Sequence, residues 1–98
     1  MNWVKVSLIM YELEYSTQFK KDFKKIIKRS ISDIIEVGNV ISILQRGEML
    51  DPKHVDHPLT GDWHGYRDCH VKPDLVLIYK IDNSSLKLAR IGSHSELF

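Results

Sequence analysis

The hydrophobic residues of this chain change their spacing near its middle, from a helical period to a strand period. At the start of the patterned region, Tyr11, Leu13 and Tyr15 alternate with two glutamates, which is typical of a half-buried strand. The strand pattern begins at Met10. We therefore interpret residues 1–9 as an N-terminal extension that precedes the fold.

Two helices are predicted next, because apolar residues now recur three or four positions apart. The first is expected to begin after the N-cap residue Ser16. Its apolar positions are Phe19, Phe23, Ile26 and Ile27. Residues 30–32 should interrupt it, with Ser32 as the cap of a second helix that ends at Gly47, a typical C′ residue. The apolar stripe of that helix consists of Ile34, Val37, Ile41 and Leu44, with Val40 beside it. The two helices should form a hairpin.

The second half of the chain has the pattern of strands and turns. Residues 48–61 contain prolines and a glycine and are predicted to form a loop. The expected strands are residues 63–71, 75–81 and 86–91, joined by turns at 72–74 and 82–85. The order is therefore β-α-α-β-β-β, an α+β fold with a small, mainly antiparallel sheet and the helical hairpin packed on one face. We expect residues 1–98 to form one domain.

Length and composition support a small protein with a single modest core. The chain has 98 residues, of which 43% are hydrophobic, so it can fold without metals or disulfides. Its lone cysteine, Cys69, has no partner within the chain, which fits a reducing compartment. No apolar run approaches the roughly 18 residues of a membrane span, and no signal-peptide pattern is present. We expect a soluble, cytoplasmic protein that does not act at a membrane.

The distribution of charge is more informative than its sum, which is only +1. Six basic residues fall within residues 20–29 and are opposed there only by Asp22. They are Lys20, Lys21, Lys24, Lys25, Lys28 and Arg29. Spacings of four residues would align several of them along one helix flank, where they could meet the phosphates of a nucleic acid. A solvated helix face is the equally weighted alternative.

All five histidines lie between residues 54 and 94, in the half of the chain that should form most of the sheet. Histidine both accepts and donates protons near neutral pH. RNA cleavage without a metal needs a base, an acid and a fixed cation near the phosphorus atom. The candidates for base and acid are His57, His70, Asp74 and His94. Arg90 is the candidate cation, expected on the same strand face as Leu86 and Leu88. Each of these residues, taken alone, could equally be a solvated surface or turn residue.

Metal and thiol chemistry receive less support from the sequence. His54 and His57, with Asp56 between them, have a spacing seen in metal ligands, but they lie in a loop with two prolines. No paired-cysteine or HExxH pattern accompanies them. Nothing in the sequence marks Cys69 as activated. We therefore expect neither a metal nor another cofactor.

Three motifs in the second half resemble those of a known family. They are D-H-P-L-x-G at residues 56–61, Y-R-D-x-H-V-x-P-D at residues 66–74 and G-S-H-x-x-L-F at residues 92–98. In this order they resemble the YafQ branch of the RelE/ParE toxin superfamily. The match is strong over residues 56–98, whereas residues 11–47 agree only in pattern and order.

The resemblance implies the toxin of a type II toxin–antitoxin system, a ribosome-dependent endoribonuclease that cleaves mRNA in the ribosomal A site. It implies a RelE-like fold and active-site positions at His57, His70, Asp74, Arg90, His94 and Phe98. Phe98 would position the substrate and Arg90 would stabilise the phosphate. We favour His94 as general acid and either Asp74 or His70 as general base. The six basic residues at 20–29 would contact ribosomal RNA.

Partners follow from the same resemblance. A cognate, DinJ-like antitoxin is implied, with a ribbon-helix-helix DNA-binding part and a tail that wraps the toxin. Operator DNA would be bound only through the toxin–antitoxin complex. Two rival functions remain open. A ParE-like member would bind DNA gyrase and perform no RNA chemistry, and an inactive module would bind only antitoxin or RNA.

Overall fold

The computed structural model describes residues 10–98, so the interpretation of residues 1–9 as an extension lies outside the described part. Five strands form one sheet in the order β1-β5-β4-β3-β2. The strands are β1 Glu12–Tyr15, β2 His57–Pro58, β3 Arg67–Lys72, β4 Leu75–Asp82 and β5 Ser85–Gly92. β1 runs parallel to β5, and all other pairs are antiparallel. The predicted α+β class and mainly antiparallel sheet are confirmed.

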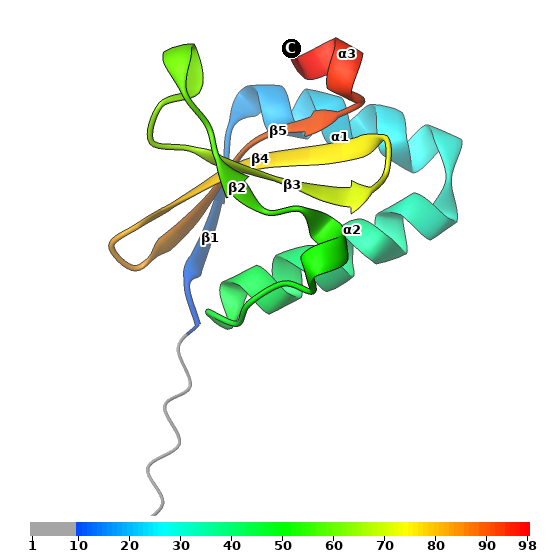
Figure 1. The fold of residues 1–98 in the computed structure, drawn as a ribbon. Helices are drawn as coiled ribbons and strands as arrows, with labels where there is room; N and C mark the ends of the chain where they lie inside the picture. Colours follow the sequence, from blue (N-terminus) through cyan, green and yellow to red (C-terminus); the bar gives the residue numbers. More distant parts are fainter. Residues whose placement is uncertain (1–9) are drawn as a thin grey trace, which may run out of the picture.

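The two predicted helices form a tight hairpin (Figure 1). Ser16 caps α1, Thr17–Arg29, by accepting a hydrogen bond from the backbone N–H of Phe19, as the sequence predicted. The prediction that Ser32 caps α2, Ile31–Gln45, is wrong. Ser30 alone separates the helices, has an extended backbone, and accepts a hydrogen bond from Asp33 N at 3.2 Å. One residue thus ends α1 and caps α2, which leaves no room for a longer break.

The main core lies between the sheet and the helical hairpin. Phe19 and Ile26 of α1, together with Val37 and Leu44 of α2, pack against side chains from β3, β4 and β5. The buried sheet residues of this cluster are Cys69, Val71, Leu75, Leu77, Tyr79, Leu86, Leu88 and Ile91. Both helices therefore cover one face of the sheet, as predicted, and fix the rigid platform on which the other face is displayed.

The opposite face of the sheet carries a smaller apolar cluster around Val76 and Ile78. Leu97 of the short helix α3, His94–Leu97, is buried in it. α3 follows the end of β5 (Figure 1) and was not predicted, although Ser93 and Glu96 form a capping box that is legible in the sequence. Gly92 allows the close approach, because a Cβ atom there would lie 3.3 Å from Glu96 and 3.4 Å from Leu97.

Two other predictions about strands need correction. β1 is not half-buried, since Leu13 is 44% and Tyr15 59% exposed. Within residues 10–98 it is an edge strand, paired with β5 on one side. The strand predicted from Trp63 begins instead at Arg67, because residues 61–63 form the 3₁₀ helix η2. The predicted loop at 48–61 contains a 3₁₀ helix, η1 Pro52–His54, and the short strand β2.

Candidate active site

Adjacent strands place the candidate residues in two rows on the sheet face that the helices leave open. In the first row, Asp68 on β3 is opposite Ile78 on β4, which is opposite Arg90 on β5. In the second row, His70 is opposite Val76, which is opposite Gly92. Strands lie about 4.8 Å apart, so each row spans roughly 10 Å. The backbone thus brings together residues that are more than twenty positions apart in sequence.

Asp68 is the buried centre of this face, with 3% of its surface exposed. Its Oδ1 lies 3.1 Å from Nδ1 of His57 but receives no well-directed hydrogen bond within residues 10–98. Burial raises the pKa of Asp68, and the nearby His57, His70 and His94 each oppose that rise. Of these three histidines, His57 lies closest to Asp68 by the printed distance, and the charges of His70 and His94 reach the same carboxyl group. The sequence analysis did not name Asp68 as a site residue, although it alternates with His70 in the Y-R-D-x-H motif.

His57 is presented by a loop whose geometry is fixed on both sides. Its Nδ1 lies 2.8 Å from the carbonyl oxygen of Val55, a residue with a positive φ of 47°. Because a carbonyl only accepts, Nδ1 carries the proton and Nε2 is an acceptor in the neutral ring. The neighbouring Asp56 accepts hydrogen bonds from Arg67 Nε, at 2.7 Å, and from the Tyr79 hydroxyl. These contacts tie the loop to β3 and β4.

The turn between β3 and β4 brings His70, Asp74 and His94 to one end of the sheet. His70 Nδ1 donates to the carbonyl oxygen of Pro73 at 3.3 Å, which leaves Nε2 as an acceptor. Asp74 Oδ1 accepts a hydrogen bond from the backbone N–H of His94 at 3.4 Å. The ring of His94 lies 5.0 Å from that of Phe98, centroid to centroid. His70, Asp74, His94 and Phe98 therefore lie near one another, at the end of the sheet that α3 adjoins.

Arg90 reaches this face by a different route from the one predicted. The register between β4 and β5 shifts after Ile78, so that Ala89 is an extra residue in β5. Arg90 consequently pairs with Ile78 of the smaller cluster, whereas Leu86 and Leu88 face the helices. The β-bulge interrupts the alternation from which Arg90 was expected to share their face, and the Arg90 side chain extends to Asp22 of α1.

The guanidinium of Arg90 is held by Asp22, the one acidic residue of the basic segment. Nε lies 2.8 Å and Nη2 3.2 Å from the two carboxylate oxygens. Asp22 is 5% exposed and also accepts hydrogen bonds from Ile91 N and Gln18 Nε2. Burial acts to raise the pKa of Asp22, but these hydrogen bonds and the Arg90 charge outweigh it, so the net pKa is lowered. The sequence offered no signal for this partnership.

The six basic side chains at 20–29 are all exposed, and four of them adjoin two different features of the structure. Lys20 and Lys24 line an apolar groove between α1 and β1, beside residues such as Tyr15 and Ile27. Lys25 and Arg29 instead lie close enough to Glu96 of α3 to lower the pKa of its carboxyl group, after the effect of its bonds to Ser93. One side of α1 thus adjoins the histidine-bearing end of the sheet, and the other adjoins the groove.

Metal binding and thiol chemistry have little support in the described residues. Within residues 10–98, no group of three or more His, Cys, Asp or Glu side chains is arranged to hold a metal ion. His54 and His57 are divided by their contacts, since Nδ1 of His54 faces the His70 carbonyl. Burial strongly raises the pKa of Cys69, which keeps it a neutral thiol. Over the same residues, no helix is long and apolar enough to cross a bilayer.

Comparison with known proteins agrees with these features. A family model described as "Bacterial toxin of type II toxin-antitoxin system, YafQ" matches residues 11–98. The mRNA interferase toxin YafQ of Escherichia coli K12 is 40% identical over 92 residues, covering 93% of this chain and 99% of that protein. The fold and sequence therefore define a toxin of a type II toxin–antitoxin system. More specifically, the chain belongs to the YafQ toxin family.

Solved structures give the same result. A chain in the crystal structure of the E. coli DinJ-YafQ toxin–antitoxin complex matches with a TM-score of 0.82 and 41% identity, covering 92% of this chain and 99% of that chain. A metal-bound toxin from Helicobacter pylori matches with a TM-score of 0.84 and 43% identity, covering 91% of this chain and 100% of that chain. The predicted RelE/YafQ-like fold is thereby confirmed.

Proposed function

We propose that this chain is an mRNA interferase, an endoribonuclease that cleaves mRNA on the ribosome by metal-independent acid–base catalysis. The observation that carries the proposal is the placement of His70, Asp74, His94 and Phe98 at one end of this sheet face, with His57 beside the buried Asp68. The E. coli relative named mRNA interferase toxin YafQ supports the same substrate class.

In the proposed reaction, the 2′-hydroxyl oxygen attacks the adjacent phosphorus while the bond from phosphorus to the 5′-oxygen breaks. His70 accepts the 2′-hydroxyl proton on Nε2, the position that its hydrogen bond to Pro73 keeps free. His94 donates a proton to the departing 5′-oxygen. The products are a 2′,3′-cyclic phosphate and a 5′-hydroxyl end. Each of these proton transfers contributes roughly 10²–10⁴-fold to such reactions.

The sequence analysis left Asp74 and His70 as alternative general bases. With His70 as the base, Asp74 has another role. Its carboxylate accepts from the backbone N–H of His94, at the N-terminal end of α3. That contact joins the β3–β4 turn to α3 and so sets the spacing between His70 and His94. We assign Asp74 the positioning of the acid relative to the base, with His70 as the base.

The developing charge on the phosphate would be met by Arg90 and His57. Asp22 occupies Nε and Nη2 of Arg90, and a guanidinium has five N–H groups in total. Three N–H groups therefore remain for phosphate oxygens. His57 would add positive charge from the other side of the face when protonated. Phe98, 51% exposed and beside the His94 ring, would pack on a nucleobase next to the cut.

The ribosome would be contacted through the basic residues of α1 that adjoin the site, Lys25 and Arg29. Both lie near Glu96 of α3, as Arg90 does, so the three cations form one positive region. Phosphate contacts of this kind give affinity without sequence readout. Ribosomal RNA and the mRNA backbone are the proposed ligands of this surface.

The antitoxin would bind the side of α1 that carries Lys20 and Lys24. A groove lined by Leu13, Tyr15, Phe23, Ile27 and Ile41 carries Lys20 and Lys24 at its margin. An antitoxin tail with apolar and acidic side chains complements that surface in both respects. The E. coli relative crystallised with DinJ supports an antitoxin partner. We further propose a ribbon-helix-helix part on that antitoxin, through which the complex binds its operator.

Induction of the chain in cells, followed by mapping of transcript 5′ ends, tests the proposed function. Cleaved messages should appear with the wild type and disappear with His94→Ala, while His64→Ala, an exposed histidine outside the site, should still cleave. His94→Ala should keep its affinity for the antitoxin, because α3 lies away from the groove.

Two other results would identify the rival functions. Relaxed plasmid DNA with intact messages would show a gyrase-directed toxin instead. Intact messages, intact supercoiling and a growth effect unchanged by His94→Ala would show a binding module without catalysis. Either result would overturn the proposal.

A further inference from the structure

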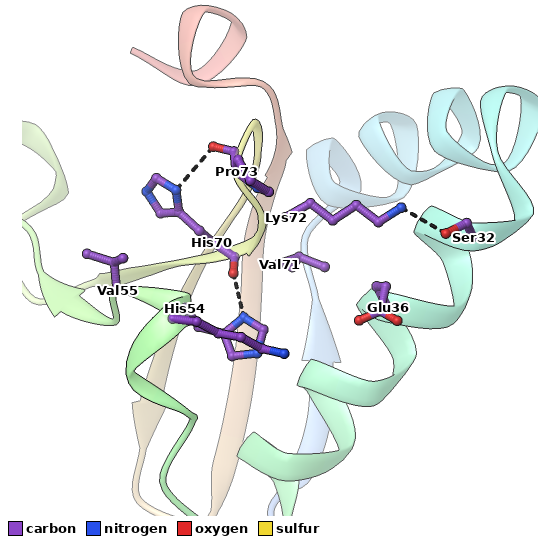
Figure 2. A pocket seen from close by; sticks show the side chains of 9 residues that line it. Ser32, Glu36, His54, Val55, His70, Val71, Lys72 and Pro73 are labelled. Carbon is purple, nitrogen blue, oxygen red and sulfur yellow. Dashed lines mark hydrogen bonds between the residues drawn. The ribbon is translucent and has the colours of Figure 1, made fainter.

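A cavity of about 550 Å³ opens beside His70, between η1, β3 and α2 (Figure 2). His70 lines this cavity, and its ring also hydrogen-bonds to Pro73 in the β3–β4 turn. Its volume lies within the range of roughly 300–1,000 Å³ that is usual for small-ligand sites. Val55, Val71 and Pro73 give it apolar walls against which a flat ring can pack.

His54 contributes a hydrogen-bond acceptor to the cavity. Its side chain lines the cavity although the residue is only 7% exposed, and Nδ1 lies 2.6 Å from the backbone carbonyl oxygen of His70 (Figure 2). Since that carbonyl only accepts, Nδ1 must donate, and Nε2 of the neutral ring is an acceptor. In the described part of the chain Nε2 has no hydrogen-bond partner. Nε2 of His54 can therefore accept a hydrogen bond from a ligand that enters the cavity.

Glu36 contributes a second acceptor. It lies on α2, across the cavity from His54 (Figure 2), and is half-buried. Its carboxylate makes neither an ion pair nor a hydrogen bond with any residue from 10 to 98. The nearby Lys72 does not neutralise it, because its ammonium is 2.6 Å from Asp33 and 2.8 Å from Ser32. The remaining cation, Lys53, is exposed at the margin, where a phosphate could lie.

We infer that this cavity binds one nucleobase of the mRNA and selects a base that carries an exocyclic amino group. Adenine, cytosine and guanine each have such a group, whose N–H atoms match the two acceptors, His54 Nε2 and the Glu36 carboxylate. Uracil has no amino group, so its N3–H can meet only one of the two acceptors, and a carbonyl oxygen would face the other. The inference rests on the proposed function, in which His70, a residue that also lines the cavity, is the base.

The closing experiment maps the 5′ ends of transcripts after induction of the full chain. In the wild type, uracil should be depleted at least about tenfold at one position fixed relative to the cut, as expected for loss of a specific base contact. Glu36→Gln should reduce that depletion by about tenfold, since a glutamine amide can donate to a uracil oxygen. Glu12→Gln, an exposed glutamate on β1, is the matched control and should leave the pattern unchanged.

A binding measurement on the purified chain separates this inference from the proposed function. Adenosine monophosphate should shift the NMR resonances of His54 and Val71 with at least about tenfold higher affinity than uridine monophosphate. Equal responses to the two nucleotides would overturn the inference. So would cleavage by the wild type without a uracil-poor position, or identical patterns for wild type and Glu36→Gln. Selective nucleotide binding without any cleavage would instead count only against the proposed function.

Discussion

Asp22 on α1 holds the guanidinium of Arg90 on β5 through two hydrogen bonds of 2.8 and 3.2 Å, across 68 positions of sequence. The same carboxylate also receives the backbone N–H of Ile91. The helix therefore fixes both the side chain and the local backbone of the proposed phosphate-binding residue. Asp22 is buried, so the pair is shielded from water more than a surface ion pair would be.

This relationship predicts that Asp22 and Arg90 act as one unit in cleavage. Arg90→Ala should lower kcat by about 10²–10³-fold, which is usual for loss of a fixed charged donor. Asp22→Asn should lower kcat by about tenfold with little change in KM, because Arg90 stays charged but loses its orientation. The double variant should be no slower than Arg90→Ala. Single-turnover cleavage on programmed ribosomes measures the cycle, and additive losses would show that the two residues act independently.

The contact between Tyr79 and Asp56 predicts a second positioning effect. Burial, together with the Asp56 carboxylate, raises the pKa of Tyr79, so its hydroxyl remains protonated and donates. Tyr79→Phe removes this donor and should lower the free energy of unfolding by about 1–2 kcal/mol. It should also slow cleavage, because Asp56 anchors the loop that carries His57. Urea denaturation and cleavage assays check both effects.

Tyr15→Phe is the matched control for that variant, since its ring is 59% exposed. It should change neither stability nor cleavage. An unchanged cleavage rate in a destabilised Tyr79→Phe would show that the contact supports only the fold.

Asp68 predicts a pH-dependent stability with a definite sign. Burial raises its pKa above the ordinary value of 3.8, despite the opposing charges of His57, His70 and His94. A raised carboxyl pKa contributes stability that is present below pH 3.8 and is lost as the pH rises through the folded-state pKa. Asp68→Asn should therefore become more stable relative to wild type on going from acid to neutral pH. Chemical denaturation across that range measures the difference.

Asp62→Asn, on an exposed part of η2, serves as the control and should track the wild type at every pH. If the stability of Asp68→Asn relative to wild type falls as the pH rises, the ionised carboxylate is the favoured form. The three histidines would then outweigh the burial of Asp68.

The division of the basic segment predicts two separable phenotypes. The double variant Lys20→Glu, Lys24→Glu should bind the antitoxin about tenfold more weakly and cleave normally, since both side chains line the groove. The double variant Lys25→Glu, Arg29→Glu should cleave more slowly and bind the antitoxin normally. Calorimetry with the antitoxin and cleavage on ribosomes measure the two properties. Equal effects of both pairs on both properties would show one undivided surface.

Much of this fold is legible in the sequence because its local signals agree. Ser16 is a cap, Gly47 has the left-handed φ of 71° that ends α2, and the apolar period changes where the helices give way to strands. The errors have physical causes. Ser30 ends α1 and caps α2, and two serines spaced two residues apart give no local sign of which one is the cap. Strand β1 alternates correctly, but alternation does not say whether a strand will lie at an edge.

The site was less accessible to sequence reasoning. Titratable residues could be named because acid–base chemistry limits the residue types, and the turn at Pro73 does bring His70 near the N-terminus of α3. The bulge at Ala89 could not be foreseen, because it depends on the register of the partner strand. The pairing of Asp22 with Arg90 was not predicted, because Asp22 lies in a lysine-rich segment and the two residues are 68 positions apart. Long-range pairings of this kind have no local signature.

Cys69 lies between Asp68 and His70 in β3, with its thiol wholly enclosed on the helix side of the sheet. A thiol reagent can reach it only when that strand separates from its neighbours. Because the chain has a single cysteine, the rate of labelling reports on one event. The labelling rate of Cys69 therefore measures how often strand β3, which bears Asp68 and His70, opens. The rate can be compared between the free toxin and the toxin with a bound partner.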